Sequence, residues 1–462
     1  MSLVFPALFA FNTAVDTLDS ATNRASPGFI ARLRESTAAR EGLYVLAAQG
    51  LATLIALAVD RMLFHELPKS ERGTLSAALS VRNILLYIAD MGLSLTTIRV
   101  AAEYFSKQQI AEARFIFRRA LVSRMVLALC VSLAALLLSP ALASVVLGSS
   151  HQSPLIWAAT AALFGMTATS WGGDVSRSTR QYGRYFWHQV VESALRAAAV
   201  IGILFIFVSA VSHSSESVLW AIAIASTLAG AFSILLHQDV LARNTKLDTP
   251  VEQMLRKQLR DFGRYAGGIA LLVTIGSQVE ILMIIALLGP EQTAIYDGGR
   301  RLALVLPLVV GAISTVLLPR AASINTLAGC KSYLRKAVWT TTVIALIASG
   351  GLAAISGIVV PWFSYPESTT VLRWLCLAYG LSIIFFPVAL VLYPLQRAGT
   401  LLFIHAVSLA LSIGFSLWMI PRYGAIGAAW SALIVRIVSL VLLAFFIQRI
   451  LKSNPNLAPL NE

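Results

Sequence analysis

Long apolar runs separated by short polar segments are the dominant pattern of this 462-residue chain. Each run has about 20 residues, the length that an α-helix needs to cross roughly 30 Å of hydrocarbon. The runs do not alternate as the strands of a membrane β-barrel do, and a helix satisfies its backbone hydrogen bonds within the segment. The pattern predicts an all-α polytopic membrane protein with about twelve transmembrane helices, at about 42–62, 74–98, 120–147, 155–174, 186–208, 218–237, 265–288, 294–318, 337–360, 370–394, 400–420 and 424–447.

The two halves of the chain repeat weakly, with an offset of 221 residues. At this offset "LPKSERGTLSAA" (67–78) falls on "LGPEQTAIYDGG" (288–299), and Arg99 falls on Arg320. Parallel repeats of this kind place a substrate site between two bundles. We therefore expect two six-helix lobes, a 6+6 pseudo-repeat, around a central cavity. The predicted units are a cytoplasmic N-terminal segment (1–41), an N-lobe (42–240), a cytoplasmic linker (241–262), a C-lobe (263–450) and a cytoplasmic C-terminal tail (451–462).

The distribution of basic residues predicts the orientation. The chain is 57% hydrophobic, only 13% charged, and carries 36 Lys and Arg. Placing the N-terminus in the cytoplasm puts 25 of the 36 in inner segments, as the positive-inside rule requires. The outer loops then hold four, namely Arg61, Lys69, Arg72 and Arg422. Basic loops against an anionic leaflet explain the net charge of +14, so we expect membrane lipid and no nucleic acid as a partner.

Seven basic residues remain for the spans themselves. Arg124 and Arg373 lie near span ends, where a long side chain can reach water. The other charges within spans are five arginines (Arg82, Arg196, Arg300, Arg301 and Arg436) and four acids (Asp90, Glu192, Glu280 and Asp297). Each would cost roughly 2.5–3.5 kcal/mol at a helix centre if it faced lipid. Two interpretations avoid that cost: buried ion pairs that fix helix packing, or a hydrated cationic pathway. The excess of arginine favours the second, because its planar fork suits phosphate and carboxylate groups.

Two spacings sharpen the candidate site. His188, Glu192 and Arg196 follow at i, i+4 and i+8, which predicts one polar stripe on a helix. The seventh and eighth spans form a hairpin with its apex near 289–290, so Glu280 should lie at a depth similar to that of Arg300 and Arg301 and pair with one of them. Gln278, like His188, is a candidate polar residue of the cavity.

Several stretches of the sequence resemble those of a known family of membrane transporters. The loop forms "LPKSERG" and "LGPEQTA", the stretch "VEILMIIALLGPEQTAIYDGGRRL" (279–302) and "PRYGAIGAAWSALI" (421–434) are similar to the multidrug/oligosaccharidyl-lipid/polysaccharide exporter superfamily. They resemble most its polysaccharide-transporter branch, the flippases of O-antigen and exopolysaccharide repeat units. The resemblance implies a transport role for an acid in span seven and for cavity cations, by position Glu280, Arg82, Arg300 and Arg301.

What the resemblance implies about function is an anionic lipid-linked oligosaccharide, a polyprenyl-pyrophosphate glycan, moved across a bacterial inner membrane by alternating access. Coupling to H⁺ or Na⁺ fits the four in-span acids, and a polysaccharide polymerase and chain-length machinery are expected partners. No cofactor is implied.

Two other function classes remain open. A cation-coupled multidrug antiporter of the same superfamily would favour a net acidic cavity, whereas the in-span balance here is positive. A membrane-embedded glycan polymerase or transferase would favour a large outer loop with catalytic carboxylates, and the predicted outer loops are short. The sequence has no P-loop, no CxxC and no metal-ligand spacing among its cysteines and histidines. We expect no catalytic residues and no metal site, hence no enzyme.

Overall fold

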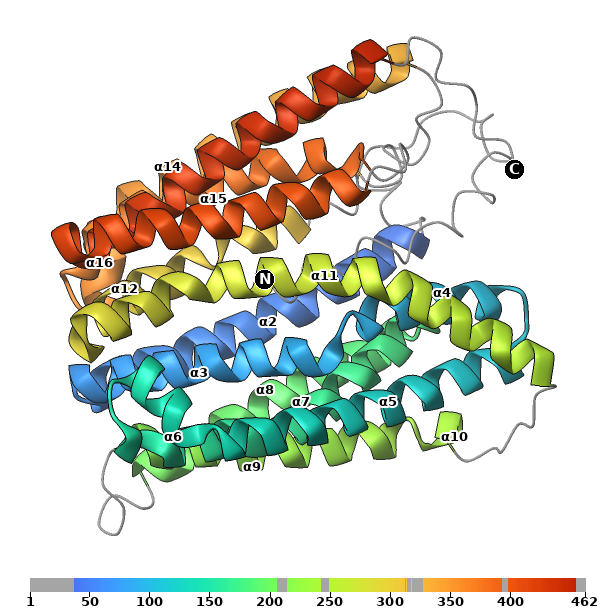
Figure 1. The fold of residues 1–462 in the computed structure, drawn as a ribbon, viewed down its shortest axis with the longest axis horizontal. Coiled ribbons are helices and arrows are strands. Elements are labelled where there is room, and N and C mark those ends of the chain that lie inside the picture. Colours follow the sequence, from blue (N-terminus) through green and yellow to red (C-terminus); the bar gives the residue numbers. More distant parts are fainter. Residues whose placement is uncertain are drawn as a thin grey trace.

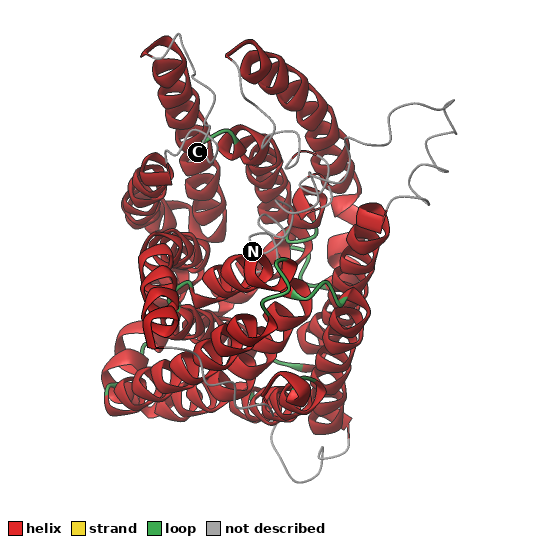
Figure 2. Cartoon of the chain, turned by 90° about the vertical axis from the view of Figure 1, so that its right-hand side faces the viewer, coloured by secondary structure: helices red, strands yellow, loops and turns green. Residues whose placement is uncertain are grey.

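The computed structural model describes residues 37–205, 214–241, 249–311, 313, 317, 327–392 and 398–453. Nearly all of these residues are helical, and the described part of the chain contains no strand (Figure 2). Most of the predicted 1–41 segment, the tail beyond residue 453 and residues 242–248 of the predicted linker lie outside the described residues. So does part of the eighth predicted span, 294–318.

The described residues of the first half of the chain form seven long helices. Pro68 is the N-cap of the second of these helices, a position where its missing backbone donor breaks no helical hydrogen bond. Their bounds are α2 (Thr37–Glu66), α3 (Lys69–Asp90), α4 (Leu93–Ser106), α5 (Ile110–Leu137), α7 (Ser153–Ser178), α8 (Tyr182–Phe205) and α9 (Ser215–Leu236), with the short α6 (Ser139–Leu142) and α10 (Gln238–Leu241) between them.

The second half contains α11 (Thr249–Leu288), α12 (Pro290–Ala303), α14 (Leu327–Phe363), α15 (Ser368–Leu390) and α16 (Ala398–Ser453). The described part of the predicted linker, 249–262, is helical and continuous with the seventh span in α11. The helix α16 holds the two last predicted spans, and Gly424, with a φ of 62°, interrupts its helical backbone between them. A positive φ is a conformation that glycine adopts readily.

Membrane-spanning helices dominate the described residues. Eight of them are long and apolar enough to cross a membrane, and the bent pair α3–α4 raises the number to nine. That pair bends by 43° at Met91 and Gly92, both in the left-handed conformation. The prediction of an all-α polytopic membrane protein is confirmed.

The helices form two groups that diverge from one end (Figure 1). We call this the closed end; it carries the turns at 67–68, 289 and 364–367. One apolar cluster runs through both groups there, with Phe64 and Leu75 on one side and Phe363 and Leu372 on the other. At the opposite end the clusters are separate: one joins α4, α5, α7 and the start of α11, and others lie within α14, α15 and α16. Apolar burial therefore joins the lobes at the closed end.

The predicted repeat is visible in the helices that join the two groups. The helices α3 and α12 begin at Lys69 and Pro290, which are 221 residues apart. They cross in direct contact, because Gly73 lies so close to Pro290 that a Cβ at position 73 would meet its carbonyl oxygen at 1.8 Å. Ser76 and Asp297 are also 221 residues apart, and their side chains hydrogen-bond to each other at 2.7 Å. Equivalent residues can touch only near the axis that relates the two copies, so this contact marks the axis.

Candidate functional site

A cavity of about 490 Å³ lies between the two lobes, lined by residues of α2, α3, α7 and α8 together with Arg301 and the segment 304–311. We call it the interlobe cavity. Its charged lining residues are five arginines and three carboxylates: Arg82, Arg124, Arg177, Arg196, Arg301, Asp60, Asp90 and Glu192. Five of the nine predicted in-span charges come together here, namely Arg82, Arg196, Asp90 and Glu192 from the N-lobe and Arg301 from the C-lobe.

Arg124 neutralises two carboxylates in the wall of the interlobe cavity. Its guanidinium lies 3.1 Å from Asp90 and 2.7 Å from Asp174, and Arg177 contacts Asp174 at 2.7 Å. The prediction that Arg124 reaches water from a span end is wrong, because its side chain is only 1% exposed. Its position along the chain suggested a span end, but the rotation of α5 turns the side chain inward between α3 and α7.

The predicted stripe on α8 contains one ion pair. Arg196 donates to Glu192 at 2.7 Å, and both line the interlobe cavity. His188 is 2% exposed, and neither ring nitrogen has a hydrogen-bond partner among the described residues. It is not one of the residues that line the interlobe cavity. Two residues of the predicted stripe, Glu192 and Arg196, therefore line the cavity, whereas His188 is packed inside the N-lobe.

Arg82 on α3 differs from the other arginines of the interlobe cavity. Its guanidinium donates to Asn83 at 3.1 Å, and no carboxylate of the described residues lies within ion-pair distance. The residue is 8% exposed and its Nε has no partner. The charges of Arg196 and Arg301 repel it, and Glu192 attracts it only from a distance. Arg82 is thus the cavity cation whose charge is left uncompensated.

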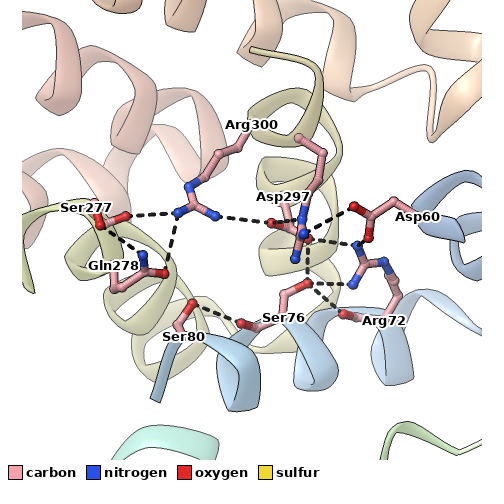
Figure 3. A network of polar contacts seen from close by, with 9 residues as sticks. Asp60, Arg72, Ser76, Ser80, Ser277, Gln278, Asp297 and Arg300 are labelled. Carbon is pink, nitrogen blue, oxygen red and sulfur yellow. Dashed lines mark hydrogen bonds and ion pairs between the residues drawn. The ribbon is translucent and has the colours of Figure 1, made fainter. Parts of the chain in front are cut away.

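A second network closes the interface at the closed end (Figure 3). Arg72 contacts Asp60 at 3.1 Å and Asp297 at 3.0 Å, and Arg301 contacts the same two carboxylates at 3.1 and 3.2 Å. Ser76 accepts from Arg72 and donates to Asp297. The assignment of Arg72 to an outer loop is wrong, since its side chain is fully buried in α3. The predicted spans left residues 63–73 as a loop, whereas only Leu67 and Pro68 lie between α2 and α3.

Arg300 lies between that network and α11 (Figure 3). It donates to the Ser277 carbonyl at 3.1 Å and to the Gln278 side chain at 3.4 Å, and lies 3.6 Å from Asp297. Arg300, Asp297 and Gln278 do not line either cavity described here. Arg300 and Gln278 therefore connect α12 to α11, whereas Asp297 connects α12 to α3.

A second cavity, of about 190 Å³, lies within the C-lobe between α11, α15 and α16. We call it the C-lobe cavity. It contains Glu280 and Arg436, four serine hydroxyls of α15 and α16, and several aromatic rings. Arg436 donates to Ser382 at 3.1 Å and lies 4.7 Å from the Tyr379 ring centroid. Pro307 lines both cavities, so they approach each other there.

The predicted pairing of Glu280 with Arg300 or Arg301 is wrong. The contact of Glu280 is Ser412, which donates to its carboxylate at 3.5 Å, and no ion pair to it occurs among the described residues. A hairpin fixes the depth of a residue but not its rotation about the helix axis. Glu280 faces α16, while Arg301 faces Asp60 and Asp297.

Sequence reasoning missed three residues that complete the charge networks: Asp60, Arg72 and Asp174. All three lie within a few residues of a predicted span boundary, where a charge is expected to face water. The signal that could have found Asp174 is its i, i+3 spacing to Arg177 in α7.

Residues 38–325 match the model of a family described as polysaccharide biosynthesis protein. Among solved structures, the fold is similar to an inward-facing multidrug resistance MATE family transporter of the MOP superfamily, with 13% identity, 88% of this chain and 96% of that chain covered, and a TM-score of 0.69. It is also similar to the lipid II flippase MurJ in an inward closed conformation, with 12% identity, 88% and 87% covered, and a TM-score of 0.67. An outward-facing MATE transporter gives a TM-score of 0.59 at 14% identity, with 93% and 99% covered. Among curated proteins, none matches the chain. The predicted two-lobe fold is confirmed.

Proposed function

Because this chain belongs to the polysaccharide biosynthesis protein family, we propose that it is a flippase for an anionic lipid-linked oligosaccharide, a polyprenyl-pyrophosphate glycan. Transport proceeds by alternating access, with the interlobe cavity as the substrate site. The fold shared with MOP superfamily structures supports a transporter rather than an enzyme.

The observation that carries this proposal is the uncompensated charge of Arg82. The other charges around the interlobe cavity neutralise one another: Arg196 with Glu192, Arg124 and Arg177 with Asp90 and Asp174, and Arg301 with the closed-end carboxylates. A buried cation without a counter-ion is costly, and an anionic substrate that supplies one removes this cost. Arginine binds phosphate with two parallel hydrogen bonds, so the diphosphate of the lipid carrier suits this position.

The remaining features of the cavity suit the rest of the substrate. Arg196 and Arg301 also line it, and each can give a donor to phosphate while keeping a carboxylate partner. Polar residues such as Gln49, Asn83 and Gln189 line the same cavity and offer hydrogen bonds to glycan hydroxyls. The hydrocarbon of the polyprenyl chain stays in the surrounding membrane lipid, because transferring it into a polar cavity would be unfavourable.

Glu280 is our candidate for coupling to H⁺ or Na⁺. It is a buried carboxylate in the C-lobe cavity with a serine hydroxyl as its near contact and Arg436 as the strongest charge acting on it. A carboxylate without an ion pair can accept a proton or a cation at lower cost than one held by an arginine. Arg436 lines the same cavity from α16, and by this proposal its charge acts on Glu280 rather than on the diphosphate of the substrate.

The protein would reside in a bacterial inner membrane with both termini in the cytoplasm, which places the closed end on the outer side. A polysaccharide polymerase and its chain-length machinery would then receive the delivered repeat unit.

The experiment is flipping of a fluorescent polyprenyl-pyrophosphate glycan in proteoliposomes, followed by its accessibility to an outside quencher. Arg82→Ala should reduce the rate by about 10- to 100-fold, the size expected for losing a charge-assisted hydrogen bond of roughly 1.5–3 kcal/mol. The flipping rate of Arg82→Lys should lie between those of Arg82→Ala and the unchanged protein, because lysine keeps the charge but lacks the planar guanidinium fork.

The matched control is Arg373→Ala, since Arg373 has a serine partner, Ser356, and lines neither cavity. It should flip the substrate at the unchanged rate. Equal rates for Arg82→Ala and the unchanged protein would reject Arg82 as the phosphate site. Transport of an organic cation dye, blocked by Glu280→Gln and not by Arg82→Ala, would point instead to a multidrug antiporter.

A further inference from the structure

The four charges at the closed end are arranged in a ring that alternates in sign and in lobe membership. Asp60 and Arg72 belong to the N-lobe, and Asp297 and Arg301 belong to the C-lobe. Each charge contacts one opposite charge in its own lobe and one in the other lobe, at 3.0–3.2 Å. These four charges are therefore neutral as a whole and also neutral in each half. Arg300 of the C-lobe borders the ring at a longer distance, 3.6 Å from Asp297.

This division has a consequence for separating the lobes. When a buried ion pair is pulled apart, each partner is usually left as an unpaired charge, and that is strongly unfavourable. Here Arg72 keeps Asp60 and Arg301 keeps Asp297 when the lobes part. Only the two cross-lobe contacts and the Ser76–Asp297 hydrogen bond are lost.

The surroundings of the ring also join the two lobes at this end. Outside it, Lys69 pairs with Glu367, and the Arg61 guanidinium lies 4.4 Å from the Trp362 ring centroid. Gly73 on α3 allows the backbone of Pro290 on α12 to approach. The ring lies next to the Ser76–Asp297 contact that marks the pseudo-symmetry axis, so it sits where a rotation of the lobes would act on it directly.

We propose that Asp60, Arg72, Asp297 and Arg301 form a separable latch, which holds the closed end shut and opens without leaving a buried charge unpaired. The latch makes the closed state specific, because a shift of α3 along α12 would separate Arg72 from Asp297. It acts on the two-lobe fold, whatever the cargo, and goes beyond the proposed function in that respect.

Charge exchange tests the cross-lobe part of the latch separately from the part within each lobe. Asp60→Arg combined with Arg72→Asp keeps one acid and one base in the N-lobe, but sets like charges against Arg301 and Asp297. Asp297→Arg combined with Arg301→Asp does the same from the C-lobe. All four substitutions together restore opposite charges at every contact.

The readout is the distance across the closed end, measured by double electron–electron resonance in nanodiscs. Spin labels are placed at Ser70→Cys and Thr370→Cys, both on exposed side chains, after Cys130, Cys330 and Cys376 are replaced by alanine. Each two-residue exchange should lengthen the distance, and the four-residue exchange should return the short distance. A short distance in both two-residue exchanges, or a long one in the four-residue exchange, would overturn the latch.

A second measurement covers exchange variants that do not fold. Asp60→Asn alone leaves Arg72 and Arg301 sharing Asp297, whereas Asp60→Asn with Arg72→Gln leaves the C-lobe pair intact. The double variant should therefore melt at a higher temperature than the single one, although it carries more substitutions. A lower melting temperature for the double variant would contradict the idea that the charges of the ring within each lobe neutralise each other. Neither measurement uses a cargo, so failure of the flipping assay and failure of the latch are distinguishable.

Discussion

The interlobe cavity and the C-lobe cavity occupy neighbouring places in the fold but differ in chemistry. The first is lined by five arginines and three carboxylates contributed by several helices. The second has one carboxylate and one arginine among serines, aliphatic side chains and aromatic rings. A fixed set of counter-charges can replace the water around an anionic head group, whereas a mostly apolar cavity cannot. This difference supports the proposed anion site at the lobe interface rather than in the C-lobe cavity.

The two halves share a repeated backbone but carry different charged residues at equivalent positions. At the offset of 221 residues, Arg82 corresponds to Ala303 and Asp60 to Ile281, while Asp297 corresponds to Ser76. Residues near the pseudo-symmetry axis touch their own equivalents, as Ser76 and Asp297 do. Two carboxylates there would repel each other in contact. The two copies can therefore share a backbone, but they cannot share their charges.

The largest effect should come from Gly73→Val, which tests how closely the two copies must approach. A side chain there collides with the Pro290 backbone, so α3 and α12 cannot pack and the closed end should stay open. The distance between labels at Ser70 and Thr370 measures this directly. Gly276→Ala is the matched control in the C-lobe cavity, where a Cβ meets nothing within 4 Å. It should leave the distance between the labels unchanged. A longer distance in the Gly276→Ala variant would show that the wall of the C-lobe cavity does not tolerate an added side chain either.

The second comparison sets Asp297→Asn against Glu280→Gln. Asp297 holds Arg72 and Arg301, and breaking buried pairs by removing one partner costs about 3–5 kcal/mol. Glu280 has a serine contact and no ion pair among the described residues, so its neutral analogue should lose less than about 1 kcal/mol. Thermal unfolding in one detergent measures both. A comparable loss for the two would mean that Glu280 is a structural counter-ion.

Arg436→Gln asks whether the C-lobe cavity contributes to anion binding. The change removes the hydrogen bond to Ser382 and the contact with the Tyr379 ring, together worth about 1–3 kcal/mol of folding free energy. The rate of flipping of the lipid-linked glycan should change by less than about threefold. This is far less than the effect of Arg82→Ala, for which the loss of one charge-assisted contact to phosphate should cost about tenfold or more. A reduction as large as that of Arg82→Ala would extend the anion site into the C-lobe.

The smallest effect should come from the exposed pair of Lys69 and Glu367, which is the solvent-facing counterpart of the buried latch. Its two side chains are 38% and 53% exposed, and such pairs contribute about 0–1 kcal/mol. The hydrogen bond from Lys69 lowers the pKa of the Glu367 carboxyl below its ordinary value. Its contribution is therefore present above the unfolded pKa of roughly 4.3 and is lost as the pH falls through the lowered pKa. Lys69→Met should remove this pH dependence from the melting temperature. In the unchanged protein, added salt should weaken the same pH dependence. A melting temperature that responds neither to the substitution nor to salt would show that the pair contributes nothing.

Several features of the fold follow from local patterns. Apolar runs of span length predicted α5, α9 and α15, and the glycines near the predicted turns lie at Gly289 and Gly424, both with positive φ. The charges within the spans marked a site at the lobe interface, because such charges cannot face lipid. Arg82, Glu192 and Arg196 are found there.

The partners of those charges did not follow from the sequence. Glu280 and Arg301 have similar depth in one hairpin, but the rotation of each helix about its axis sends them to different cavities. Arg72 is the fourth residue of α3, close to the turn, and it is buried because the C-lobe covers it.

The sequence by itself determined that the chain crosses a membrane as helices and repeats with two lobes, because hydrophobicity and helix length are properties of neighbouring residues. Only the tertiary structure decided which charges neutralise each other and which cation of the interlobe cavity, Arg82, has no carboxylate partner among the described residues. Ion pairing acts over a few ångströms between residues up to 298 positions apart, and that proximity exists only once both lobes have packed.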